Sequence, residues 1–209
     1  EPPSGTRFIL TSSEPGRLLA TIRSRAVPLH LAPLPQDRVA AFLVSEAGVD
    51  DRTAAWAAGL SQGSIGRALG FLPQGDEAGP LEALRRDALG IVEAVLAAGR
   101  APGFALALAQ ASGRARSLVE LYAFVEEWLR DLSAVASGAE DKVISQDVLP
   151  HLRQLAAARS LDPSAIAAAL PALEEARELS RANVNPQLVV SGLLRRLRRT
   201  LGPAVPGGT

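Results

Sequence analysis

The chain has 209 residues, with 22 Lys and Arg against 22 Asp and Glu, so its formal net charge is zero. It contains no Cys and only two His, which excludes disulfides, thiol nucleophiles, zinc-thiolate sites and histidine-rich metal clusters. Hydrophobic residues make up 47% of the chain and aromatic residues only 4%, a mixture that favours helices packed through small side chains. No apolar run approaches the roughly 20 residues that span a bilayer, and no signal segment opens the chain. We therefore expect a cytoplasmic protein with no membrane contact.

The first predicted element is a short apolar run of strand type, Arg7 to Thr11. A lone strand cannot satisfy its backbone N–H and C=O groups without neighbours. We therefore expect a sheet that this sequence does not contain, and we interpret the chain as the C-terminal portion of a longer α/β protein.

A short helix follows the predicted strand. Ser12, Ser13 and Pro15 favour its start, and it is expected to extend to Arg23. An extended apolar segment over residues 29–31 then completes a region that we define as residues 1–34.

Residues 35–73 predict a small helical module. Gly48 ends its first helix, Asp50 opens the second, which Trp56 anchors, and Ser64 precedes the third. The expected helices cover Pro35 to Ala47, Ala54 to Leu60 and Ile65 to Leu72.

Residues 74–80 are polar and rich in helix breakers, which is typical of a linker. Residues 81–201 then predict a bundle of about five or six helices, followed by a flexible tail over 202–209. The longest amphipathic stripe includes Leu118, Tyr122 and Trp128. The expected helices cover 81–96, 104–111, 118–132, 148–158, 163–180 and 186–201. The predicted fold class is mainly α.

Two features of residues 1–34 could carry chemistry. The hydroxyls of Ser12 and Ser13 follow a strand, at the position where α/β sheets usually bind nucleotides. Arg23 and Arg25 lie at the end of a helix, where a guanidinium can reach a phosphate on a neighbouring molecule. The alternative is that the serines cap a helix and the arginines pair with acids.

The run EPPSGTRFILTSSEP, followed by LLATIRSR, resembles the sensor 1 strand and Ser-Arg-Cys region of AAA+ subunits of bacterial clamp loaders. Delta-prime subunits of DNA polymerase III are the most similar, with tau/gamma subunits next. The resemblance implies that residues 1–34 end an AAA+ nucleotide-binding domain, with Ser12 and Ser13 at sensor 1 positions. Ser24 and Arg25 match the Ser-Arg motif, and Ala26 replaces its Cys. Arg25 is thereby implied to be an arginine finger that acts in trans on ATP-Mg bound by a neighbouring subunit.

Residues 35–73 resemble the lid domain of the same family, and Gly63 to Leu69 resemble its sensor 2 turn. Gly66 stands where ATP-hydrolysing relatives commonly have an arginine. Arg67, the sensor 2-like residue, comes one position later, about 100° further round a helix, so it should point elsewhere. The sequence also contains no Gly-rich phosphate loop with Lys. These departures favour a non-hydrolysing delta-prime type, although a shifted register would restore Arg67.

Residues 81–201 loosely resemble the oligomerising collar of clamp loaders; a self-contained bundle is the alternative. The resemblance implies a DNA replication subunit that helps to load the sliding clamp on primed DNA, together with tau/gamma and delta subunits. It implies no complete active site and no bound cofactor in this chain itself, only association with the polymerase holoenzyme. An ATP-hydrolysing tau/gamma-type subunit and a structural helical interaction module remain alternatives.

The remaining polar candidates favour structural interpretations. The arginine cluster over 195–199 could bind nucleic acid phosphates, but the solvated end of a helix is favoured. The paired carboxylates at 126–127 and 174–175 are expected on exposed helical faces rather than in an acid/base site. His30 is expected to be packed or at an edge, and His151 is a lone helical residue.

Overall fold

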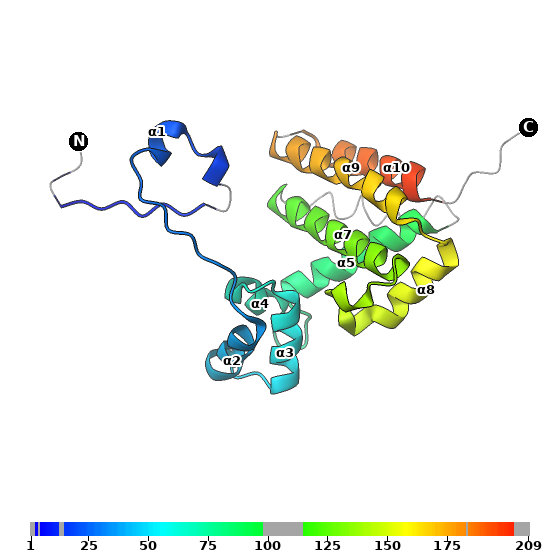
Figure 1. Cartoon of the computed structure of the whole chain (residues 1–209), viewed down its shortest axis with the longest axis horizontal. Coiled ribbons are helices and arrows are strands. Elements are labelled where there is room, and N and C mark those ends of the chain that lie inside the picture. Colours follow the sequence, from blue (N-terminus) through cyan, green and yellow to red (C-terminus); the bar gives the residue numbers. More distant parts are fainter. Residues whose placement is uncertain (1–2, 4, 13–14, 98–114, 183, 203–209) are drawn as a thin grey trace, which may run out of the picture. The chain divides into compact units, whose positions relative to one another are not determined.

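The computed structural model describes residues 3, 5–12, 15–97, 115–182 and 184–202 (Figure 1). The chain divides into two compact units, Glu1–Pro33 and Leu34–Thr209. The first unit contains only two short helical pieces in its described part, whereas the second consists of packed helices.

The first unit contains the 3-10 helix η1 (Pro15–Arg17) and the short helix α1 (Ala20–Arg23). The prediction of a strand over residues 7–11 is wrong, because these residues have no regular secondary structure and pair with no other described segment. Phe8 is 73% exposed and Ile9 is 91% exposed. The physical reason is that a strand needs hydrogen-bonding neighbours, and no described segment of the unit supplies one.

The three helices predicted for residues 35–73 are confirmed as α2 (Gln36–Ala47), α3 (Asp51–Leu60) and α4 (Ile65–Phe71). Gly48 ends α2 in the left-handed conformation, with φ of 65°. The Asp50 carboxylate accepts a hydrogen bond from the Thr53 N–H at 3.0 Å, and the Ser64 hydroxyl accepts one from the Arg67 N–H at 3.2 Å. The predicted N-caps of α3 and α4 are therefore confirmed.

The second half of the larger unit is a helical bundle, as the apolar periodicity predicted. The predicted helix over 104–111 and the tail over 203–209 lie outside the described residues. Two 3-10 helices, η2 and η3, connect α7 to α8. The elements are α5 (Pro80–Leu96), α7 (Ala115–Ala136), η2 (Glu140–Lys142), η3 (Gln146–Val148), α8 (Leu149–Arg159), α9 (Pro163–Arg181) and α10 (Pro186–Leu201).

Helix α7 is the centre of the bundle: it packs against α5, α8 and α9, and α9 packs in turn against α10 (Figure 1). Every residue of its predicted apolar stripe is buried, which confirms the helical period over this segment. The buried stripe consists of Leu118, Leu121, Tyr122, Val125, Trp128, Leu129 and Leu132.

The segment predicted as a linker folds into a tight turn between α4 and α5. The backbones of Gln74 and Glu77 form an antiparallel bridge, with N···O distances of 3.0 and 3.3 Å. Gly79 is buried, and a Cβ atom there would lie 2.5 Å from the backbone of Phe71 and of Leu72. Only glycine therefore fits this close approach. The turn brings α5 back against α4, so the two helices pack together.

Candidate functional site

Arg25, the predicted finger, lies just after α1 and is exposed. Its backbone N–H donates to the Ile22 carbonyl at 3.1 Å, but its guanidinium has no hydrogen bond or ion pair with any described residue. Ser24 ends α1, and its hydroxyl donates to the Thr21 carbonyl at 3.3 Å. The guanidinium of Arg25 is therefore uncommitted within the described chain, which a role toward another molecule requires.

The sensor 1-like serines come before η1 in the sequence of this unit. Ser12 is exposed, and Ser13 lies outside the described residues. Because the preceding segment is not a strand, the structure does not display Ser12 at a sheet edge. The role of the two hydroxyls in a nucleotide site stays a prediction.

Arg67, the sensor 2-like residue, lies in the first turn of α4 in the larger unit. Its side chain is only 18% exposed. The guanidinium forms ion pairs with Glu120 and Glu127 of α7, at 3.2 and 2.6 Å. Arg67 is thus bound inside the chain, in contrast to Arg25.

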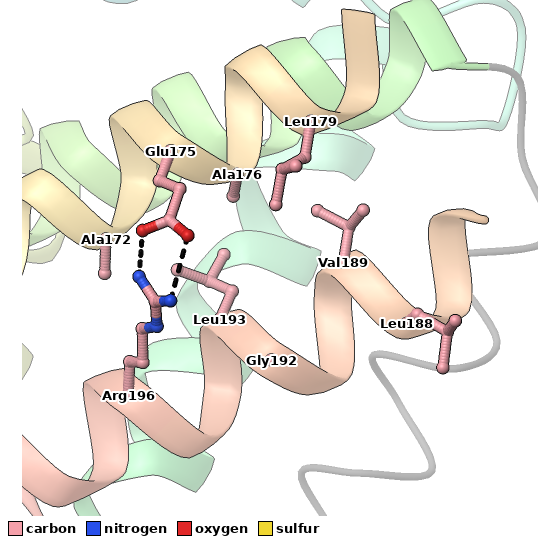
Figure 2. Close-up of a pocket in the computed structure, with 9 residues that line it drawn as sticks. All are labelled: Ala172, Glu175, Ala176, Leu179, Leu188, Val189, Gly192, Leu193 and Arg196. Carbon is pink, nitrogen blue, oxygen red and sulfur yellow. Dashed lines mark hydrogen bonds and ion pairs between the residues drawn. The ribbon is translucent and has the colours of Figure 1, made fainter. Parts of the chain in front are cut away.

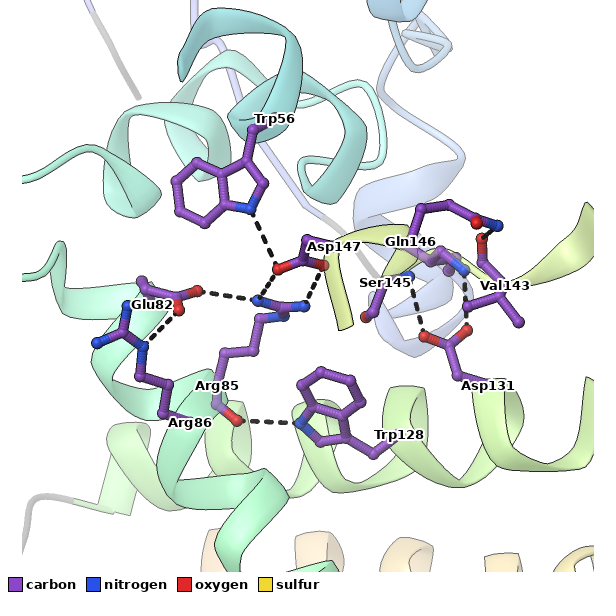
Figure 3. A network of polar contacts seen from close by, with 11 residues as sticks. Trp56, Glu82, Arg85, Arg86, Trp128, Asp131, Val143, Ser145, Gln146 and Asp147 are labelled. Atoms are coloured by element: carbon purple, nitrogen blue, oxygen red, sulfur yellow. Dashed lines mark hydrogen bonds and ion pairs between the residues drawn. The ribbon is translucent and has the colours of Figure 1, made fainter. Parts of the chain in front are cut away.

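A second buried arginine, Arg85 of α5, was not singled out by the sequence analysis. Its side chain is 4% exposed and is surrounded by carboxylates (Figure 3). It donates to both oxygens of Asp147, at 3.0 and 2.7 Å, and to Glu82 at 3.1 Å. The signal in the sequence was its position four residues after Leu81, on the apolar face of the predicted helix.

Two tryptophans complete the Arg85 network (Figure 3). The indole N–H of Trp128 donates to the Arg85 carbonyl at 3.0 Å, and the guanidinium carbon lies 4.6 Å from the Trp128 ring centroid. The indole N–H of Trp56 donates to Asp147 at 3.3 Å. The network therefore joins α3, α5, α7 and η3, so Trp56 acts as more than the apolar anchor that was predicted.

A buried carboxylate holds the loop that carries Asp147. Asp131 of α7 is 2% exposed and accepts hydrogen bonds from the N–H groups of Ile144 and Ser145, at 2.9 and 3.0 Å. Two such bonds satisfy both carboxylate oxygens (Figure 3). Asp131 thus positions the chain just before η3.

The prediction that the carboxylates at 126–127 lie on an exposed face is wrong. The Glu126 side chain is 17% exposed and pairs with Arg177 of α9, and that of Glu127 is 20% exposed and pairs with Arg67. The reason is that Arg177 of α9 and Arg67 of α4 reach these two carboxylates and cover them in part. Burial raises the pKa of Glu127, and the neighbouring Arg67 lowers it in part. Glu174 and Glu175 are exposed, as predicted.

The two histidines lie in different units. His30 is exposed rather than packed. His151 of α8 contacts Glu93 of α5 through its Nε2 atom. Among the residues that the structure describes, no three His, Cys, Asp or Glu side chains gather to hold a metal ion. None of the helices described is long and apolar enough to cross a membrane.

Two arginines of the cluster at the end of α10 contact other parts of the described chain, and two do not. Arg196 pairs with Glu175 of α9, and Arg198 donates to the Ala97 carbonyl at 3.3 Å. Arg195 and Arg199 are exposed, with no partner among the described side chains. Arg195 and Arg199 therefore agree with the prediction of a solvated helix end, whereas Arg196 and Arg198 are held by contacts within the protein.

A small groove lies between α9 and α10, next to the Arg196–Glu175 ion pair (Figure 2). Leu188 on its rim is 68% exposed, and Leu179 is 38% exposed. Its volume of about 60 Å³ has room for a few water molecules and not for a nucleotide. The lining residues are Ala172, Glu175, Ala176, Leu179, Leu188, Val189, Gly192, Leu193 and Arg196.

Comparison of the sequence with known proteins finds a relative that matches nearly the whole chain. The chain is 32% identical over 207 residues, 98% of its length, to DNA polymerase III subunit delta' of Escherichia coli (strain K12). It spans 58% of the length of that protein. No family model matches the chain. The resemblance to delta-prime subunits, which was predicted mainly from residues 1–34 and 35–73, is therefore confirmed across nearly the whole chain.

Proposed function

We propose that the chain is part of a clamp-loader subunit of the delta-prime type, which acts in DNA replication. The observation that supports this function is the 32% identity to DNA polymerase III subunit delta' along 98% of the chain. The proposed partners are the tau/gamma and delta subunits of the loader, with the sliding clamp and primed DNA reached through the complex.

Each region of the chain then corresponds to a proposed domain of the clamp-loader subunit. Residues 1–34 contribute the end of an AAA+ nucleotide-binding domain, residues 35–73 the lid and residues 81–201 the collar. The chain itself binds no nucleotide in this proposal, and ATP-Mg is held by a neighbouring subunit.

Arg25 is the proposed arginine finger. An arginine acting in trans stabilises the charge that develops on the transferred phosphoryl oxygens, because its planar guanidinium is permanently charged and donates in a fork. Two observations support the choice: the side chain is exposed, and no described residue neutralises it. Ser24 ends the helix directly before Arg25 and would fix the direction in which the chain leaves α1.

The clamp-loader assignment is tested by assembly. The complete protein that carries this chain is mixed with tau/gamma and delta subunits, and the mass of the complex is measured by light scattering after size exclusion. A defined complex containing all three is expected. Failure of the protein to join the other two would overturn the proposed function.

The finger is tested in the same complex by substitution. Arg25→Ala should assemble normally but lower DNA-stimulated ATP hydrolysis. Arg23→Ala is the matched control, because Arg23 is an exposed arginine two positions earlier, at the end of α1. Equal activity of the two variants would refute the role of Arg25 while leaving the clamp-loader assignment intact.

A further inference from the structure

Arg67 uses each of its donor nitrogens inside the chain. Nε donates to the Leu60 carbonyl at 3.4 Å, Nη1 to Glu120 at 3.2 Å and Nη2 to Glu127 at 2.6 Å. Leu60 ends α3, Arg67 belongs to α4, and both carboxylates belong to α7. One guanidinium therefore joins the consecutive helices α3 and α4 to α7, whose carboxylates lie more than 50 residues later in the sequence.

Aromatic rings enclose the same guanidinium. Its central carbon lies 4.8 Å from the ring centroid of Phe124 and 5.8 Å from that of Phe71. The two rings are themselves in edge contact, with centroids 6.0 Å apart. A cation over an aromatic face is attracted to it, and more strongly where water is excluded. Phe71 comes from α4 and Phe124 from α7, so this packing spans the same boundary as the ion pairs.

Glu127 is held from the α4 side by two groups. Besides Arg67, the amide nitrogen of Gln62 donates to its Oε1 atom at 2.8 Å. Burial raises the pKa of Glu127, as expected for a carboxylate removed from water. Loss of Arg67 would leave Glu120 and Glu127 on one flank of α7 without a cation, and a partly buried carboxylate without its partner is strongly destabilising.

We propose that Arg67 is a clasp that fixes the orientation of the α2–α4 module on α7. The tight turn over residues 74–79 positions α5 against α4, and the clasp holds the module against α7. Because Nε, Nη1 and Nη2 each donate to a group of this chain, the clasp holds the guanidinium in place and occupies three of its five N–H donors. The clasp concerns this chain alone and stands whether or not the proposed clamp-loader function does.

The clasp is tested by a distance measured between the module and the bundle. The chain contains no Cys, so a pair can be introduced at two exposed alanines, Ala41 of α2 and Ala168 of α9, and spin-labelled. Pulsed electron resonance on the full chain should give one narrow distance. Arg67→Ala should lose that narrow distance and give a broad distribution, with the helical circular dichroism retained.

Arg130→Ala is the matched control. Arg130 pairs with Glu126 four residues earlier on α7 and is 64% exposed, so it joins nothing across the boundary, and the narrow distance should persist. If Arg67→Ala unfolds, the double variant Glu120→Gln and Glu127→Gln replaces it, because it removes both ion pairs and keeps the arginine. A narrow distance retained without the ion pairs, or a broad distance in the unsubstituted chain, would overturn the proposal.

Discussion

The two units of the chain differ in how their side chains are used. In residues 34–202 the apolar side chains fill a continuous core, and the buried arginines are neutralised by carboxylates from other helices. In residues 3–33 no described side chain is buried, and Val27, Leu29 and Leu31 are each more than four-fifths exposed, at 95%, 83% and 85%. The larger unit thus buries its apolar side chains and pairs its buried arginines, whereas the smaller unit has no buried side chain among its described residues.

The difference separates two kinds of arginine that look alike in the sequence. Arg25 was matched to the arginine-finger position of the family, and Arg67 was placed one residue after its sensor 2 arginine position. Arg67 has its nitrogens engaged within the larger unit, and Arg25 has no partner among the described residues. An arginine that is already bound in this way contributes to stability, and one that is exposed and unpaired is available to another molecule.

The sharpest test of this contrast substitutes one phenylalanine in each unit. Phe71 is 1% exposed and contacts Trp56 and Phe124 at ring-centroid distances of 6.0 Å, whereas Phe8 is 73% exposed. Phe71→Ala should lower the free energy of unfolding by about 3–5 kcal/mol, because it removes core contacts and leaves a cavity. Phe8→Ala should change it by less than about 0.5 kcal/mol in the same urea titration. Equal losses would contradict the contrast.

A slightly smaller effect is expected at the Arg85 network. Arg85→Ala leaves Glu82 and Asp147 without their buried cation, and breaking such a pair costs about 3 kcal/mol or more. Arg86→Ala is the control: Arg86 also pairs with Glu82 but is 68% exposed, so its loss should cost less than about 1 kcal/mol. Urea unfolding of the two variants compares them, and a larger loss at Arg86 would refute the importance of burial.

The pH dependence of stability should reveal the burial of Glu127. Its pKa is raised above the ordinary value of 4.5, so the folded chain holds this proton more tightly than the unfolded chain. The contribution of Glu127 to stability is therefore full below pH 4.5 and is lost as the pH rises through its folded-state pKa. Relative to Glu127→Gln, the unsubstituted chain should lose stability over that range. This account would be contradicted if the difference in free energy of unfolding between the two proteins stayed constant with pH, or if the unsubstituted chain became the more stable one as the pH rose.

The smallest effect is expected at Tyr122, buried between α7 and α9. Its hydroxyl and that of Ser180 have no hydrogen bond of ordinary geometry with a described residue, and burial raises the pKa of Tyr122. Tyr122→Phe should thus change the free energy of unfolding by less than about 1 kcal/mol. Trp128→Phe, which removes an indole N–H that does donate, should cost about 1–3 kcal/mol. If Tyr122→Phe lowered the free energy of unfolding more than Trp128→Phe, the Tyr122 hydroxyl would have to form a hydrogen bond, which would contradict the structure.

Most of the larger unit could be predicted because its local signals agree with its packing. The apolar period placed α7 and its buried stripe, and Gly48, Asp50 and Ser64 marked the helix ends. Capping depends on residues three or four positions apart, so the sequence contains all the information that it needs. The segment over 7–11 failed for the opposite reason, since a strand depends on partners that the local sequence does not supply.

The polar networks could not be predicted because they join distant helices. Arg85 and Asp147 are 62 residues apart, and Arg67 and Glu127 are 60 apart. Charged residues on one helix look solvated until the neighbouring helix is placed, which is why the pair at 126–127 was misassigned to an exposed face. Arg25 was found only through its resemblance to a family motif, because an exposed arginine has no local signature of function.

The proposal that Arg25 acts on a neighbour's ATP is tested most directly by separating chemistry from binding. In the assembled complex with primed DNA, the affinity for ATP and the single-turnover rate of its cleavage are measured for the unsubstituted protein and for Arg25→Ala. A finger that acts in the transition state should lower the cleavage rate by about 10³-fold or more and leave the affinity nearly unchanged. An unchanged cleavage rate in a fully assembled Arg25→Ala complex would contradict the account.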